Sequence, residues 1–118
     1  MELIIYIVIK RIIMNEKIGN FCKIFKGEYD GENGKENLWF NPFDRNNILP
    51  TSDLLFDKDW NWLMFVVEKI EKINNYSEDN EFDIFGKCVQ LGEKEYVGDN
   101  KFDATLKAVI DYIDNNVL

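Results

Sequence analysis

The fold is decided by the stretch "DWNWLMFVVEKIEKI", Asp59–Ile73, which has the apolar spacing of a single amphipathic helix. At about 100° per residue, six apolar side chains fall in one sector that would face a sheet: Trp60, Leu63, Val66, Val67, Ile70 and Ile73. Trp62 lies on the border of this sector, and Phe65 falls on the charged side, near Lys69. We therefore expect Trp60 in the core and Trp62 in the core or at its boundary.

Phe65 has two interpretations. Its ring is either covered by the aromatic stretch "LWFNPF", Leu38–Phe43, or exposed as an anchor for a partner, because aromatic residues are enriched at the centres of interfaces. Asp57 and Asp59 precede the helix and are expected to cap its N-terminus.

A three-stranded antiparallel meander is predicted after this helix. The stretch "FDIFGKCVQLG", Phe82–Gly92, contains two short strands around the pair Gly86–Lys87. The strand "KEYV", Lys94–Val97, follows the pair Gly92–Glu93. Glycine in the first position of a two-residue loop favours a type II′ hairpin at both turns.

The chain closes with a second amphipathic helix, in "DNKFDATLKAVIDYIDN", Asp99–Asn115. An apolar stripe is formed by Phe102, Leu106, Val109 and Ile113. The opposite face carries Asp103, Lys107, Asp111 and Asp114. This acidic face is either solvated or a contact surface for a partner.

The segment before the main helix is expected to hold one helix and a long connection. Asn15–Phe25 has apolar residues at helical spacing, with Asn15 as a cap and Gly27 as a stop. Gly27–Asn37 is predicted to be a solvated loop, and Pro42 argues against a central strand at Leu38–Phe43. The fold class is therefore α+β: a three-stranded antiparallel meander with about three helices packed on it, similar to an α-β-α sandwich.

The N-terminal run "LIIYIVI", Leu3–Ile9, is too short to span a membrane. Its positive charges, Lys10 and Arg11, follow the apolar run, whereas in a signal peptide they would precede it. Residues 1–13 are therefore either a β-strand, because the run is β-branched, or an extension before a natural start at Met14. A single domain is expected over residues 14–118.

Composition excludes several kinds of chemistry. The net charge is −8, and the range from Glu78 to Asp114 contains ten acidic residues but only four lysines. This excess of negative charge disfavours direct nucleic-acid binding and favours a basic partner. Some basic residues near the N-terminus leave an RNA contact there open: Lys10, Arg11, Lys17, Lys23 and Lys26. The sequence has no histidine and two separated cysteines, so no catalytic, metal-ligating or cofactor-binding residues are predicted.

The stretch "DWNWLMFVVEKIE", Asp59–Glu71, resembles the motif of the phage α-β-α sandwich domain family, small proteins of phages and prophages. The similarity extends from "NEKIGNF", Asn15–Phe21, to "GDNKFDATLKAVIDYI", Gly98–Ile113. The family motif has a proline at the position of Phe65, and the apolar run before Met14 lies outside the matched region. The resemblance implies a phage or mobile-element protein, and no catalytic residue can be carried over from it.

The resemblance and the charge together predict a non-enzymatic accessory protein that binds a host protein in the bacterial cytoplasm, with no membrane partner. The most specific version of this prediction is an anti-CRISPR-like inhibitor of a host defence nuclease, with a basic RNA-guided nuclease complex as the target. The candidate partner-binding residues are Trp62, Phe65, Lys69, Asp103, Asp111 and Asp114. One alternative is a structural or accessory protein that associates with itself as a homodimer. A less favoured alternative is a metal-dependent hydrolase with paired carboxylates, although no carboxylate spacing in the sequence matches a known metal-binding loop.

Overall fold

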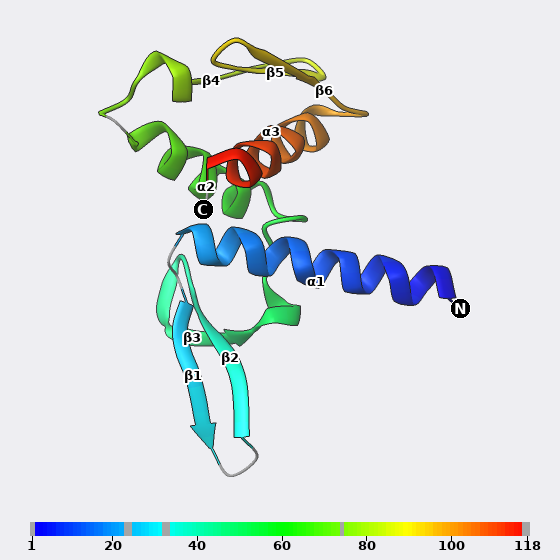
Figure 1. The fold of residues 1–118 in the computed structure, drawn as a ribbon, viewed down its shortest axis with the longest axis vertical. Coiled ribbons are helices and arrows are strands. Elements are labelled where there is room, and N and C mark those ends of the chain that lie inside the picture. The colour runs from blue at the N-terminus through cyan, green and yellow to red at the C-terminus, as the bar shows by residue number, and fades with distance from the viewer. Residues whose placement is uncertain (1, 23–24, 32–33, 74, 117–118) are drawn as a thin grey trace. The chain divides into compact units, whose positions relative to one another are not determined.

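The computed structural model describes residues 2–22, 25–31, 34–73 and 75–116. These residues form three α-helices, two short 3-10 helices and two small antiparallel sheets, which confirms the predicted α+β fold (Figure 1). The chain divides into two compact units, Met1–Asp57 and Lys58–Leu118, called the N-terminal and C-terminal units below. Within the described part of the chain, every helix is too short or too polar to cross a bilayer.

The N-terminal unit consists of one long helix and one meander. Its elements are α1 (Glu2–Cys22), β1 (Phe25–Gly31), β2 (Gly34–Asn41), β3 (Asp44–Pro50) and the 3-10 helix η1 (Thr51–Asp53). The strands are antiparallel in the order β1-β2-β3. Among the side chains of this unit that the structure describes, the fully buried apolar ones are Ile18, Trp39, Leu54 and Phe56.

The C-terminal half of α1 approaches the buried ring of Trp39. A Cβ atom added at Gly19 would lie 2.6 Å from Cζ3 of Trp39, so only glycine permits this approach. The indole Nε1 of Trp39 donates a hydrogen bond of 2.8 Å to Oγ1 of Thr51, which fixes the ring against η1.

Three expectations for the start of the chain are wrong. Leu3–Ile9 belongs to α1 and is not a strand. No glycine or proline interrupts residues 3–18, and isoleucine and valine lower helix stability by only a few tenths of a kcal/mol each, so one continuous helix forms. Asn15 is not a cap but a buried residue inside α1. The helix ends at Cys22, before the predicted stop at Gly27, and residues 23–24 lie outside the described residues.

Asn15 is held by polar partners within this unit. Its side-chain Nδ2 donates to the backbone carbonyl of Arg11 (3.1 Å) and to Oδ1 of Asp57 (3.0 Å). The Arg11 guanidinium also pairs with the Asp57 carboxylate. Asp57 therefore anchors the middle of α1 and does not cap a helix, contrary to the prediction.

Most of the predicted loop consists of paired strands. Gly27–Gly31 belongs to β1 and Gly34–Asn37 to β2, and they pair in antiparallel register with Glu28 opposite Asn37 and Gly31 opposite Gly34, while residues 32–33 lie outside the described residues. β2 is also the central strand of its sheet, although the sequence argued against this. The strand ends at Asn41, so Pro42 lies in the turn that follows and removes no hydrogen bond from the sheet.

The C-terminal unit contains the predicted meander. Its elements are α2 (Trp60–Lys72), the 3-10 helix η2 (Glu78–Asn80), β4 (Phe82–Phe85), β5 (Cys88–Leu91), β6 (Lys94–Val97) and α3 (Lys101–Asn116). The strand order is β4-β5-β6, all antiparallel. Helix α3 packs against the sheet, and α2 packs against α3 (Figure 1).

Both turns of this meander have the backbone that the sequence predicts. Gly86 and Gly92 have φ values of 57° and 60°, whereas the residues after them, Lys87 and Glu93, are not among the residues with positive φ. This combination of signs is that of a type II′ turn. Glycine avoids the strain that another residue would meet at these two positions.

The buried face of α2 differs at one end from the predicted sector. Trp62, Leu63, Val66, Val67 and Ile70 are buried as a group, but Trp60 is 38% exposed and Ile73 is half-buried at the C-cap. The buried arc is therefore rotated toward Trp62, and Trp60 lies just beyond its other border. Trp60 is the first helical residue, and its ring packs against Phe102 of α3 at a centroid distance of 5.9 Å. Asp59 caps α2 as predicted, accepting from the backbone N–H groups of Asn61 and Trp62.

Helix α3 buries more of its surface than one stripe. Val109 and Ile113 are buried as predicted, but Phe102 and Leu106 are half-buried. The remaining fully buried positions are Ala104, Thr105 and Ala108. Because α3 is contacted by the sheet and also by α2, small side chains are needed on its crowded side.

Candidate binding site

A pocket of about 340 Å³ opens in the C-terminal unit between the β5–β6 turn and the C-terminal end of α3. Its polar lining consists of two tyrosines (Tyr96, Tyr112), three carboxylates (Asp79, Glu93, Asp111), three amides (Asn80, Asn115, Asn116) and one ammonium group (Lys94). Leu91 and Gly92 complete the wall. The volume lies at the lower end of the range for small-ligand sites, roughly 300–1,000 Å³.

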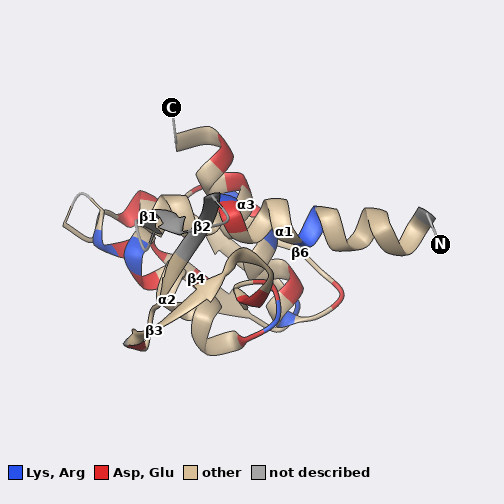
Figure 2. Ribbon diagram, turned by 90° about the horizontal axis from the view of Figure 1, so that it is seen from below, with Lys and Arg blue, Asp and Glu red and all other residues tan. Residues whose placement is uncertain are grey.

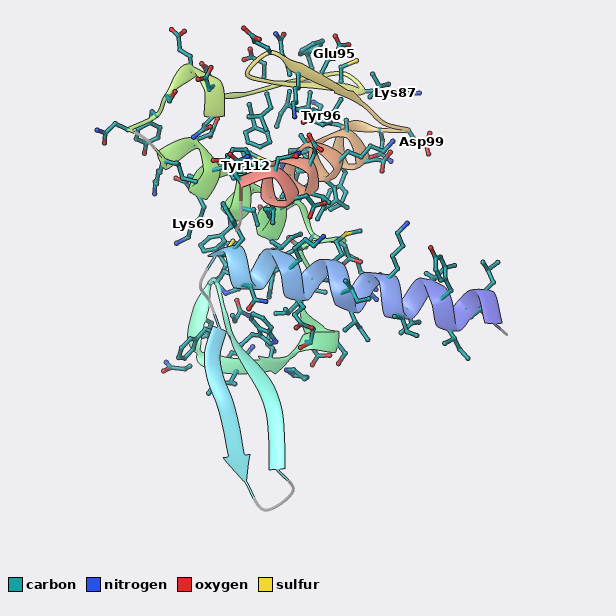
Figure 3. All side chains as sticks on the ribbon, viewed as in Figure 1. Lys69, Lys87, Glu95, Tyr96, Asp99 and Tyr112 are labelled. Carbon is teal, nitrogen blue, oxygen red and sulfur yellow. The ribbon has the colours of Figure 1, made fainter. Side chains whose placement is uncertain are left out.

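The centre of this pocket is a hydrogen-bonded group around Asp111. Along β6, Tyr96 is directed toward α3 while Glu95 lies on the outer face of the sheet (Figure 3). The Tyr96 hydroxyl donates to Oδ2 of Asp111. The ammonium group of Lys94 lies 3.4 Å from the same oxygen, and Nδ2 of Asn115 donates to Oδ1 at 3.0 Å. This group joins β6 to α3 and holds the Asp111 carboxylate in a fixed orientation.

The electrostatics of this group favour a neutral tyrosine and an ionised aspartate. Burial, together with the hydrogen bond to Asp111 and its negative charge, raises the pKa of Tyr96 to about 12. The hydrogen bond from Tyr96, assisted by Lys94 and Asn115, lowers the pKa of Asp111 below its ordinary value, against a smaller opposing effect of burial. Burial raises the pKa of Tyr112, partly offset by a hydrogen bond with Asn80. All three pKa values move away from neutrality, which suits binding better than proton transfer.

In an alkaline titration we expect Tyr96 to ionise with a pKa of about 12, well above the ordinary tyrosine value of 10.0. Replacing Asp111 with asparagine should lower its pKa toward 10, because the negative charge that opposes ionisation is removed, while the effect of burial remains. Absorbance at 295 nm between pH 8 and pH 13 would follow this titration. Tyr96→Phe should remove the transition near pH 12, and Asp114→Asn, on the same helix as Asp111, should leave the pKa of Tyr96 unchanged.

The same pKa shift has a consequence for stability. The folded protein holds the Tyr96 proton more tightly than the unfolded chain, whose tyrosines ionise near 10.0. This stabilisation is therefore complete below pH 10 and is lost as the pH rises through 12.

The structure separates the residues predicted to bind a partner. Trp62 is 5% exposed and so contributes to the core and not to a surface. Phe65 is half-buried, and the ammonium group of the exposed Lys69 lies over its ring at 5.2 Å from the centroid, so these two side chains contact each other on α2. Asp111 lies in the pocket, and Asp114 is exposed on α3.

Asp103 has a structural role at the start of α3. Its backbone N–H donates to Oδ1 of Asn100 (2.8 Å), and its Oδ2 accepts from the backbone N–H of Asp99 (3.0 Å). This reciprocal arrangement is close to a capping box. Lys107 pairs with Asp103 one turn along the helix. The sequence "NKFD", Asn100–Asp103, carries this signal, so the assignment of Asp103 to an acidic contact stripe overlooked a local explanation.

Tyr96, Lys94, Tyr112 and Asn115 were not among the predicted site residues. Alternate side chains of β6 point to opposite faces of the sheet, which places Tyr96 on the inner face. A tyrosine in that position needs a polar partner for its hydroxyl, so the sequence could have indicated a polar site there. The identity of that partner depends on how α3 lies across the sheet. The sequence therefore could not assign Asp111 to Tyr96.

Three carboxylates line the pocket, but in the described part of the chain no three or more Asp, Glu, Cys or His side chains are grouped closely enough to hold a metal ion. The structure therefore offers hydrogen-bond acceptors and aromatic surface in this pocket. Comparisons with protein-family models, curated proteins and solved structures find no match to this chain.

Proposed function

We propose that this protein acts by binding a basic protein and that the pocket of the C-terminal unit receives a cationic side chain of that partner. The observation that supports this is the composition of the lining, where three carboxylates and two tyrosines accompany a single lysine. An arginine guanidinium matches such a lining, because its planar fork of donors binds carboxylates and its face stacks on aromatic rings.

The charge around the pocket supports the same partner class. The net charge of −6 between Glu78 and Asp114 would attract a basic surface from a distance and speed its association at low salt. The Asp111 carboxylate is already ionised and oriented, so binding a cation requires little reorganisation.

Because the sequence resembles a phage protein family, we propose that the partner is a host defence nuclease and that the protein inhibits it, as an anti-CRISPR protein does. RNA-guided nucleases expose basic surfaces that bind nucleic acid, and an acidic protein of this size would compete for them. In this proposal the protein catalyses no reaction. Phe65 with Lys69 forms a second contact on α2.

The proposed cation site predicts a selective loss of binding. A fluorescent hexa-arginine peptide should bind the full chain with an affinity that falls as salt rises. Asp111→Asn should weaken binding by roughly 10- to 150-fold, because a hydrogen bond to a charged group contributes roughly 1.5–3 kcal/mol. Fluorescence anisotropy at two salt concentrations measures both effects.

Asp114→Asn is the matched control, since it removes the same charge from the same helix outside the pocket lining. Equal weakening by Asp111→Asn and Asp114→Asn would contradict a pocket and leave only a diffuse charge effect. A cleavage assay with a purified RNA-guided nuclease tests the narrower proposal separately, and Phe65→Asp tests the second contact. Unimpaired cleavage at saturating protein would reject the defence function for that nuclease.

A further inference from the structure

The first turns of α1 carry a continuous exposed apolar surface. Every side chain from Leu3 to Ile9 is exposed, with fractions between 47% and 70%, and Ile13 is 56% exposed. The sequence has no charged residue between Glu2 and Lys10, and in Figure 2 the first turns of α1 are a tan stretch that ends at a blue segment. The C-terminal half of the same helix, by contrast, buries Asn15, Ile18 and Cys22.

The apolar surface surrounds the helix and does not form a stripe. Seven consecutive helical residues at about 100° each go around the axis nearly twice, so Leu3–Ile9 leaves no polar face. A partner groove that contacts one side would leave the other side in water. The occupant must therefore contact the helix from several directions.

The exposed area is large for a protein of this size. The eight side chains Leu3–Ile9 and Ile13 are large and apolar, and each is at least 47% exposed, whereas the largest apolar patch on a typical monomer covers only roughly 300–600 Å². Each partner of a stable protein interface contributes roughly 800 Å², and eight large exposed apolar side chains can supply a surface of this kind.

We infer that this segment of α1 binds the same segment of further copies of the chain, in a bundle of more than two helices. A bundle contacts each helix from at least two sides, as an apolar circumference requires. The segment is rich in isoleucine and valine, and β-branched residues at both kinds of core position favour three- or four-stranded bundles over dimers.

The charges at both ends of the segment favour a bundle over lipid. Leu3–Ile9 is about 10 Å long at 1.5 Å per residue, only a third of the roughly 30 Å hydrocarbon core of a bilayer. It lies between Glu2 and Lys10, and insertion from either end would bring one of these charges into hydrocarbon. In a bundle both charges stay in water. Arg11 already pairs with Asp57 of its own unit.

Sedimentation of the full chain over about 1–200 µM tests the inference. We expect an oligomer of three or more copies, and for Ile5→Glu/Ile9→Glu the concentration of half-dissociation should rise at least about 100-fold, because each carboxylate would lie among apolar side chains. Phe85→Glu is the matched control, since Phe85 is 52% exposed on β4 and should leave the oligomer intact. Far-UV circular dichroism confirms that each variant is folded.

Three results would overturn the inference. They are a monomeric wild-type chain at 200 µM, an oligomer that Ile5→Glu/Ile9→Glu leaves unchanged, and a dimer as the largest species. If the monomer sediments with phosphatidylcholine vesicles and Ile5→Glu/Ile9→Glu does not, lipid is the occupant. This test does not involve the pocket residues, so its outcome is independent of the proposed binding of a basic protein.

Discussion

Trp62→Ala is expected to lower the free energy of unfolding by about 3–5 kcal/mol, the range for truncating a buried tryptophan or phenylalanine. Trp62 is 5% exposed and lies on the same face of α2 as Leu63 and Val66, which are fully buried. Removal of the indole leaves a cavity that these side chains cannot fill without moving the helix. Urea unfolding followed by far-UV circular dichroism measures this loss.

Trp60→Ala is the control for this prediction, because it removes the same side chain two residues earlier. Trp60 is 38% exposed, and its ring contact is with Phe102. An aromatic pair contributes about 0.5–1.5 kcal/mol beyond the area that it buries, so a loss of roughly 1–2 kcal/mol is expected. A larger loss for Trp60→Ala than for Trp62→Ala would show that the apolar sector drawn from the sequence is right and that the observed rotation of α2 is wrong.

Gly19→Ala is expected to destabilise the protein by about 1–2 kcal/mol, although the same change inside a helix ordinarily stabilises it by up to about 1 kcal/mol. The new methyl group would lie 2.6 Å from Cζ3 and 2.8 Å from Cε3 of Trp39. The ring is fully buried and its Nε1 donates to Thr51, so it cannot move away without losing that hydrogen bond. Overpacking of this kind typically costs 1–3 kcal/mol.

Asn20→Ala, on the same helix, is the control and should change the free energy of unfolding in the opposite direction. Asn20 is exposed, and alanine is the better helix former, so a gain of a few tenths of a kcal/mol is expected. In a Trp39→Leu background the cost of Gly19→Ala should shrink, because the clashing ring is absent. Additive effects of the two substitutions in thermal unfolding would mean that Gly19 does not face Trp39.

The sequence was most reliable where the signal was local. Two glycines at the first loop positions predicted the hairpins at Gly86 and Gly92, and a carboxylate before an apolar run predicted the cap at Asp59. The prediction was wrong where local residue preferences indicated a loop but pairing between strands produced a sheet. The strands Gly27–Gly31 and Gly34–Asn37 of this glycine-rich segment pair with each other, and a glycine-rich composition does not reveal a pairing partner.

The candidate site was only partly predictable for the same reason. The acidic face of α3 was visible in the sequence, and it does contain Asp111. The contact of Asp111 with Tyr96 joins residues on different elements, and only the packing of α3 on the sheet brings them together. Asp103 lies on the same face of a helical wheel as Asp111, yet its carboxylate accepts from the backbone N–H of Asp99 at the start of α3 and does not line the pocket.

The sequence alone predicts an acidic α+β protein with amphipathic helices at α2 and α3 and a meander whose turns begin with glycine. These features are predictable because hydrophobic periodicity and turn preferences depend on residues close together in the chain. The tertiary structure alone decided that Trp62 is buried and Trp60 is not, that Asp57 binds Arg11, and that Tyr96 holds Asp111. These outcomes depend on which face of an element meets its neighbour. A rotation of α2 by a fraction of a turn exchanges the two tryptophans while leaving the helical pattern of the sequence unchanged.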